Sequence, residues 1–387
     1  MTPQNAENPT KNPWEAKADA VAREVLGVHA NDVDVQGRWP TESLAALARS
    51  GLLGLTIPTD LGGAGEGPQT FANVTRTLAE HCASTAMIYL MHLCGIQVIA
   101  ASVFPLRESV LRSAAAGRHL STLAFSEKGS RSNFWAPVSQ AVANGDCHTL
   151  SAEKSFVTSA GQADGYVVST RAAGSSDPMA LTLYLVPRDA PGLTTGGRWN
   201  GLGLRGNSSA PMRLEGVRLP ASHRLSGDGE GFAMMMSAAL PLFQLGSAAV
   251  SVGVGRAATD ATRQHLLTTR LENLGQSLAS LPNLRARLAQ MQIILDTQQA
   301  FLESVAEQMA NPGPTTLLAL LESKAAGTEA ALQVTDLAMR ACGGAAFSRS
   351  LGVERNFRDA RAGAVMAPTT DVLYDFIGKT LLGMPLF

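Results

Sequence analysis

The sequence predicts an α+β protein in which an N-terminal α-helical domain, a central antiparallel β-barrel or sandwich domain and a C-terminal four-helix bundle follow one another. Apolar residues recur at helical spacing at first, short β-rich runs with turn residues come next, and long amphipathic stretches occupy the rest. The strand–helix alternation of a doubly wound sheet does not occur. We expect a flexible tail at residues 1–12, then domains over residues 13–117, 118–225 and 226–387.

Helices are expected throughout the N-terminal domain. In the stretch WPTESLAALARSGLLGL, Leu44 and Leu47 lie on one helical face, Thr41 is placed to cap the start, and Gly51 is placed to end the helix. The Gly/Pro-rich string IPTDLGGAGEGPQT indicates a loop. Two apolar helical runs follow, one over FANVTRTLAEHCA and one over residues 84–104.

The central domain is marked by short strand-like runs with turn residues between them. The turns are NGD, GSSD and PRDAPG, which contain the Gly, Asn, Asp and Pro that turns favour. About a hundred residues with this pattern are typical of an antiparallel β domain. The predicted strands are STLAF, PVSQAVA, GYVVSTRA, LTLYLVP and PMRLEGVRLP.

Two long helices are predicted in the C-terminal domain. The second covers residues 317–342, and Gly343 with Gly344 forms its stop. The first carries a wide apolar stripe, as a helix of a bundle requires. The residues of this stripe are Leu284, Leu288, Met291, Leu295, Leu302, Val305 and Met309.

Composition excludes several classes of protein. The 31 Lys and Arg nearly balance the 32 Asp and Glu, so a nucleic-acid partner is not expected. Only 16% of residues are charged, which favours a surface buried against other copies in a homodimer or homotetramer. The four cysteines show no CxxC spacing, so neither a metal site nor a disulfide framework is predicted. We find no signal peptide and no membrane span, and therefore expect a cytoplasmic protein.

Five strings, together with the order of the blocks, resemble the acyl-CoA dehydrogenase family over nearly the whole chain. They occur in the order in which the family carries similar motifs, and their spacing matches the expected elements. The strings are ARSGLLGLTIPTDLGGAG, LAFSEKGSRSN, KSFVTSAGQAD, LGLRGNSSAPMRLEGVRLP and RACGGAAFSRSLGVERNFRDARA.

The resemblance implies a non-covalent FAD between the β domain and the bundle, in a homotetramer or homodimer whose neighbouring subunit completes the cofactor site. A buried flavin edge needs hydrogen-bond partners, and the resemblance supplies them. It assigns Phe125 and Ser126 to the pyrimidine edge, Phe156 to the ring in place of the usual Trp, Thr158 to N5, Thr369 and Asp371 to the adenine side, and Arg270, Arg340, Gly343 and Gly344 to a neighbour's cofactor.

Each of these residues has a plainer interpretation. Ser126 and Thr158 are equally ordinary half-buried residues of β segments. Gly343 and Gly344 are, taken alone, a routine helix end, and Arg270 is a solvated charge at a helix end because LENLGQ departs from the family spacing.

The carboxylate that the family uses as a base is missing. A dehydrogenase of this kind needs a Glu or Asp in a dry site to remove the α-proton of a thioester. The family places this Glu in a YEGT turn after RDA, where the present chain has Met366, Ala367 and Pro368. Other members carry it on the helix after the β domain, just before an Arg, where the present chain has Leu242 and Phe243.

The first functional hypothesis is an FAD-dependent oxidoreductase that acts on an acyl-CoA or similar acyl substrate through a non-standard base. Asp371 is the nearest carboxylate along the chain, and Glu127 is another, although a helix-end charge and an ordinary loop residue explain them equally. The resemblance assigns Ser132, Leu242 and Phe243 to the substrate. An electron-transfer protein is the expected partner of such an enzyme.

Two alternatives stay open. In the first alternative, the chain is a two-component flavin-dependent monooxygenase or oxidase. Such an enzyme needs a flavin reductase, a dry pocket and a hydrogen-bond donor that preserves a C4a-peroxyflavin. His92 in YLMHLCG, with Ser126 or Thr158, is the candidate donor, although a lone His on an apolar helix is more often a core residue. In the second alternative, the chain is a catalytically degenerate flavin-binding partner subunit.

Overall fold

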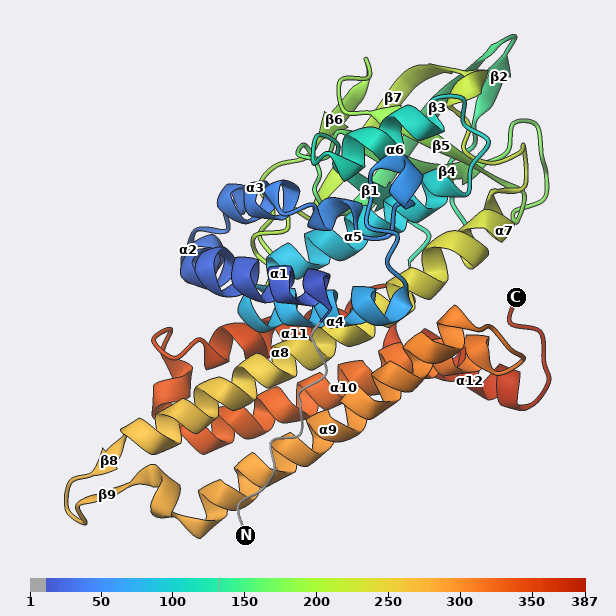
Figure 1. The fold of residues 1–387 in the computed structure, drawn as a ribbon. Helices are drawn as coiled ribbons and strands as arrows, with labels where there is room; N and C mark the ends of the chain where they lie inside the picture. Colours follow the sequence, from blue (N-terminus) through green and yellow to red (C-terminus); the bar gives the residue numbers. More distant parts are fainter. Residues whose placement is uncertain (1–11, 132) are drawn as a thin grey trace.

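Three structural units follow one another along the chain in the computed structural model, which describes residues 12–131 and 133–387 (Figure 1). Residues 1–11 of the predicted tail lie outside the described residues. Residue Asn12 is ordered as a helix cap, because its side-chain oxygen accepts a hydrogen bond of 2.8 Å from the Trp14 amide.

Helices form the N-terminal unit, as the apolar periodicity predicts. Thr41 does not cap its helix: Pro40 takes the cap position without a side-chain hydrogen bond, and Thr41 is the first helical residue. Gly51 ends this stretch with a positive φ of 79°. The helices are α1 (Pro13–Val21), a π-turn (Ala22–Leu26), α2 (Gly27–Gln36), α3 (Thr41–Arg49), α4 (Pro68–His81), α5 (Ala83–Ala100) and α6 (Arg107–Ala115).

The β domain consists of two packed sheets. One has the strand order β1-β4-β5 and the other β2-β3-β7-β6. Their facing side chains, including Leu150, Tyr166, Tyr184 and Leu214, form a separate buried core. The strands are β1 (Ser121–Ala124), β2 (Val142–Asn144), β3 (Cys147–Val157), β4 (Gly165–Arg171), β5 (Leu181–Pro187), β6 (Leu193–Thr195) and β7 (Ala210–Pro220).

The prediction of a purely antiparallel domain is wrong for one pair of strands. β1 pairs with β4 in parallel, because the chain passes through β2 and β3 of the other sheet before it returns beside β1. Of the predicted run PVSQAVA, only the end forms strand β2. The strand β3, which holds the KSFV string, was not among the predicted strands.

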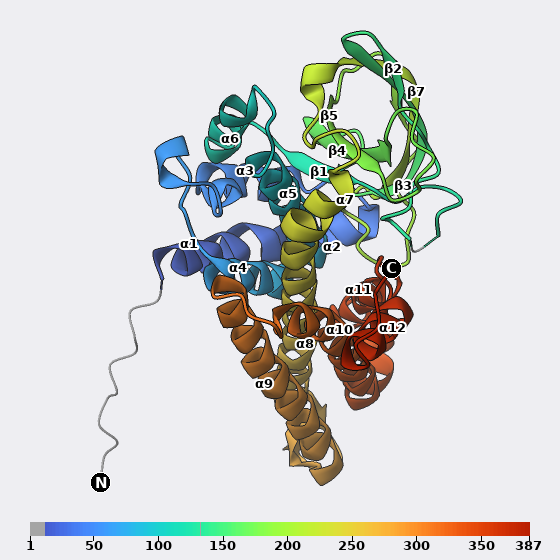
Figure 2. The same cartoon turned by 90° about the vertical axis from the view of Figure 1, so that its right-hand side faces the viewer.

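Long helices form the C-terminal unit, and α8 runs through its centre (Figure 2). Gly343 ends α10 with a positive φ of 58°, as predicted. On α9, Leu288 and Met309 are only partly buried, whereas the other five residues of the apolar stripe are buried. The elements are α7 (Gly231–Met234), a π-turn (Met235–Ala239), α8 (Leu240–Thr268), β8 (Arg270–Leu271), β9 (Gln276–Ser277), α9 (Pro282–Ala310), α10 (Thr316–Cys342), α11 (Val353–Val365) and α12 (Thr370–Leu381).

Two helical stretches are long and apolar enough to cross a membrane by length and composition. They are Ala83–Ala100 and Gly231–Thr268, and 83% and 89% of their apolar windows is buried inside the fold. Such burial is typical of core helices, whose apolar surface is already covered by protein.

Candidate functional site

A cavity of about 540 Å³ lies where the β domain meets the N-terminal helices and the bundle. Its walls come from α5, the ends of β1 and β3, residues 126–131 and Phe134, the loop over residues 199–209, the start of α8, and the turn between α11 and α12. Segments far apart in sequence therefore surround one space.

Four of the residues assigned to the flavin ring line this cavity together: Phe125, Ser126, Phe156 and Thr158. The hydroxyl of Thr158 lies 3.3 Å from that of Ser209, which also lines the cavity. Phe156 is 71% exposed despite its apolar ring, and its φ of 53° falls in the left-handed region that few aromatic residues adopt. An exposed ring held by strained backbone favours a ligand that covers it.

Another part of the wall is apolar. Met87 and Met91 come from one face of α5, and Phe243 comes from α8. Met366 and Ala367 come from the α11–α12 turn, so the residue that replaces the family's Glu lines the cavity. The two methionines were not among the predicted site residues, although their i, i+4 spacing is a signal for a shared helix face.

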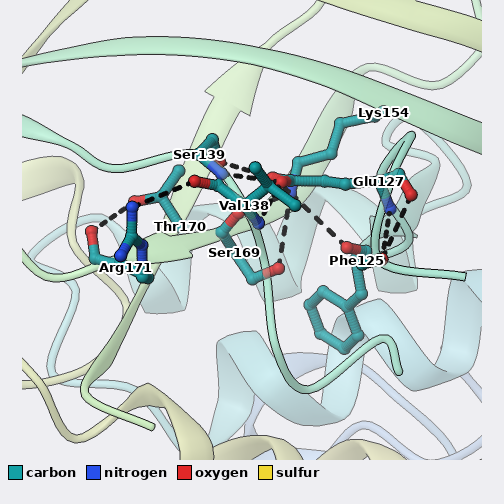
Figure 3. Close-up of polar contacts among 9 residues, drawn as sticks. Phe125, Glu127, Val138, Ser139, Lys154, Ser169, Thr170 and Arg171 are labelled. Atoms are coloured by element: carbon teal, nitrogen blue, oxygen red, sulfur yellow. Dashed lines mark hydrogen bonds and ion pairs between the residues drawn. The ribbon is translucent and has the colours of Figure 1, made fainter. Parts of the chain in front are cut away.

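Glu127 is the carboxylate residue among those that line the cavity, and its side chain is fully engaged (Figure 3). One carboxylate oxygen lies 2.7 Å from the buried Lys154 ammonium. The other accepts hydrogen bonds from the Val138 and Ser139 amides at 2.6 and 2.8 Å, and the Ser139 hydroxyl donates to the first. The carboxylate thereby ties both ends of the 127–139 loop together.

The charges of this pair are set by its environment. Burial alone raises the pKa of Glu127, but the Lys154 ammonium and the Ser139 hydrogen bonds outweigh burial and lower it. Burial lowers the pKa of Lys154, and the Glu127 carboxylate opposes that shift. A carboxylate with a lowered pKa and four hydrogen-bond donors is a weak base, so the prediction of Glu127 as a displaced base does not fit this geometry.

The prediction of His92 as a flavin-facing donor is also contradicted. His92 is fully buried and does not line the cavity. Its Nε2 donates to the Leu53 carbonyl at 2.9 Å, and its Nδ1 accepts from the Ser121 amide at 3.0 Å. Burial lowers the pKa of His92 to about 4, so the ring is neutral with both nitrogens occupied, as in a core histidine.

The other predicted catalytic and substrate residues are dispersed. Asp371 is exposed in the first turn of α12, and Thr369 caps that helix by accepting a hydrogen bond from the Val372 amide. Neither residue lines the cavity. Leu242 is buried in the core and does not line the cavity, whereas the neighbouring Phe243 does. Ser132 lies outside the described residues.

The residues assigned to a neighbour's cofactor gather at the far end of the bundle. The hairpin with Arg270 lies at that end, opposite the β domain (Figure 1). Leu266, Leu284 and Ala341 pack together there, and the Arg340 side chain is paired with Asp336 at 2.7 Å. Gly343 and Gly344 follow directly on α10. None of these assigned residues lines the cavity of its own chain.

Comparisons with known proteins give one family over most of the chain. The models of the N-terminal, middle and C-terminal domains of acyl-CoA dehydrogenases match residues 9–117, 122–217 and 229–382. The chain is 26% identical to a probable acyl-CoA dehydrogenase, YngJ, of Bacillus subtilis, over 93% of this chain and 95% of that protein. It is 28% identical to the mitochondrial short-chain specific acyl-CoA dehydrogenase of Bos taurus, over 92% and 85%.

A solved structure agrees with these matches. Butyryl-CoA dehydrogenase from Megasphaera elsdenii superposes with a TM-score of 0.90 at 22% identity, covering 95% of this chain and 97% of that chain. At this identity the likeness shows the fold alone. It confirms the predicted sequence of helical domain, β domain and helical bundle.

Proposed function

The chain belongs to the acyl-CoA dehydrogenase family, and on that premise we propose that it oxidises an acyl substrate without the family's carboxylate base. Membership makes the chain an FAD-dependent oxidoreductase. One observation carries the proposal: no cavity-lining residue of the described chain offers a free carboxylate, because Ala367 stands at the usual position and Glu127 is engaged by Lys154.

The residues present fit FAD. The exposed Phe156 ring offers an apolar surface to a flat ring system, with the Trp199 indole edge-on at 6.3 Å. Ser126 and Thr158 provide hydroxyls beside it, and the Phe125 side chain closes the space next to them. When bound, FAD supplies the hydride acceptor of the reaction.

The rest of the cavity determines what kind of substrate the chain binds. Its apolar wall, which includes Met87, Met91 and Phe243, suits an acyl chain and excludes water. Phe243 replaces the family's Arg, so this position no longer offers a cation to a phosphate of CoA, and among the described residues the cations that line the cavity are Lys128 and Arg131. An acyl group with a handle other than CoA is therefore within the proposal.

A flavin-dependent monooxygenase or oxidase is the second candidate. The observation that favours it is that the uncharged Ser, Thr and Asn side chains of the cavity carry hydroxyl or amide groups, which can donate hydrogen bonds but are not bases. Ser126, Thr158, Asn207 and Ser209 line the cavity together with its apolar residues. Such a site needs no α-proton base.

Anaerobic reduction separates acyl oxidation from reductase-dependent oxygenation, because only in acyl oxidation do the electrons that reduce the flavin come from the acyl substrate. Purified protein with FAD is mixed with butyryl-CoA and octanoyl-CoA without oxygen, and bleaching of the flavin is followed. Bleaching supports acyl oxidation. Absence of bleaching, together with oxygen consumption that requires an added flavin reductase and a substrate, supports the second candidate. A colourless protein that cannot be loaded with FAD contradicts both.

Restoring the carboxylate tests the role of residue 367. In A367E the new side chain starts from the cavity wall, so we expect bleaching by octanoyl-CoA to begin or to accelerate at least tenfold. The matched control A367Q has the same size without the base and is expected to behave as the parent. An unchanged rate in A367E with full FAD content contradicts the proposed placement.

Assembly and cellular context complete the proposal. We infer a homodimer or homotetramer, because Arg270, Arg340, Gly343 and Gly344 gather far from the cavity of their own chain. An electron-transfer protein is the acceptor in the first candidate function and a flavin reductase is the donor in the second. The expected location is the cytoplasm.

A further inference from the structure

Lys324 is a buried cation that is not among the predicted site residues. It lies on α10 with no exposed surface, and among the described residues no carboxylate forms an ion pair with it. Its ammonium donates instead to three backbone carbonyls, those of Gly363 at 3.3 Å, Met366 at 3.1 Å and Pro368 at 2.7 Å. An ammonium has three N–H donors, so all of them are used.

These three carbonyls belong to one connection. Gly363 lies in the last turn of α11, Met366 is the residue that ends this helix, and Pro368 precedes the cap of α12. The last carbonyls of a helix lack partners within the helix and carry partial negative charge. The ammonium therefore joins the end of α11 to the start of α12 and satisfies carbonyls that would otherwise be buried without a partner.

The other side of the same connection forms the cavity wall. Met366 and Ala367 line the cavity between the carbonyls that Lys324 holds. The ammonium also lies 5.9 Å from the centroid of the Phe243 ring, which lines the cavity from α8. Lys324 thus contacts the backs of two wall segments and does not itself reach the cavity.

Retaining a charge at this position costs free energy. Burial lowers the pKa of Lys324 to about 7, which reflects the penalty for keeping an ammonium without a counterion. An apolar side chain of similar length would pack there without that penalty. The directional contacts to the turn are what an apolar side chain cannot supply.

We propose that Lys324 is a positioning residue for the substrate cavity, whose ammonium holds the 363–368 turn and so determines how far residue 367 enters the cavity. The expected effect on substrate binding rests on the proposed function, whereas the effect on the turn rests on the hydrogen bonds alone. The two parts call for two measurements on the FAD-loaded protein.

The first measurement is amide hydrogen exchange of residues 363–370 in K324M. Methionine keeps most of the volume and removes the donors, so exchange in this segment is expected to rise at least tenfold while α4 is unchanged. K324R, which keeps a cation with several donors, is expected to restore slow exchange in part. K379M is the matched control, because Lys379 is a partly exposed lysine on α12 that pairs with Asp375 at 2.9 Å.

The second measurement is binding of octanoyl-CoA, followed by the change it causes in the flavin absorbance. K324M is expected to bind at least tenfold more weakly with unchanged FAD content, and K379M as tightly as the parent. If the parent itself does not bind this thioester, octanoyl-CoA is excluded as its substrate, while the exchange measurement still decides the role of Lys324.

Two outcomes overturn the proposal. One is unchanged exchange over residues 363–370 in K324M. The other is faster exchange spread evenly over the whole bundle, which would make Lys324 a general packing residue. If K324M does not fold, K324Q takes its place, since an amide retains donors for fewer of the carbonyls and must give an intermediate effect localised to the same turn.

Discussion

The buried pair of Glu127 and Lys154 gives the sharpest stability prediction. In E127Q one side-chain oxygen still accepts from the Val138 and Ser139 amides, but the new NH₂ group faces the Lys154 ammonium. Two donors then oppose each other, and the ammonium is left with the Ser169 and Phe125 oxygens, of which the Phe125 carbonyl lies at 3.5 Å. The Lys154 ammonium therefore stays fully buried without the carboxylate that balances its charge.

The magnitude follows from that burial. Removing one partner of a buried ion pair costs about 3–5 kcal/mol, because the other charge stays in the low-dielectric interior. K154M should cost less than E127Q, because the Glu127 carboxylate retains its three hydrogen bonds from Val138 and Ser139. The double variant should be more stable than E127Q alone, since it leaves no unpaired charge.

Urea unfolding followed by circular dichroism and flavin fluorescence measures these differences. The neighbouring exposed pair provides the control: Glu153 is on the same strand and pairs with Arg213 at 2.9 Å across to β7. E153Q is expected to unfold as the parent does, since exposed pairs contribute little. If E127Q and E153Q have equal midpoints, the buried pair does not stabilise this fold and the reasoning fails.

Two further predictions concern the core. H92F removes the hydrogen bonds to Leu53 and Ser121 and is expected to cost about 1–3 kcal/mol for each unpaired group. The pKa of His92 is about 4 in the folded protein and 6.5 ordinarily, so the parent is destabilised by up to about 3 kcal/mol as the pH falls from 6.5 to 4. H92F lacks this pH-dependent loss of stability. Equal slopes of stability against pH in the parent and H92F would contradict the prediction. In G203A the new methyl would lie 2.6 Å from the Arg358 carbonyl oxygen on α11, so a loss of about 1–3 kcal/mol is expected in thermal unfolding. G197A, which meets no atom within 4 Å, is the control, and equal melting temperatures would refute the close approach.

Local patterns explain why much of the fold was predictable. The apolar stripe of α9 and the stop at Gly343 depend on residues within a few positions of each other, and both are present as predicted. The replacement of the family's Glu by Ala367 is likewise a property of the sequence. Once RDA is recognised, no fold is needed to see that a methyl group stands where a carboxylate is usual.

The candidate site depended on contacts that sequence does not display. Glu127 is unavailable as a base because its partner lies 27 residues away, and His92 is a core residue because its partners lie 39 and 29 residues away. Each residue type alone is compatible with a catalytic role, but the distant partners that bind Glu127 and His92 in the fold exclude that role.

The sequence by itself determined which groups this protein possesses: the helical and strand periodicities, the family motifs, and a missing carboxylate. Only the tertiary structure decided which groups are free to react, that β1 runs parallel to β4, and that Lys324 holds the turn behind Ala367. The physical reason is that burial and pairing determine the charge and reach of a side chain, and both come from residues that only folding brings together.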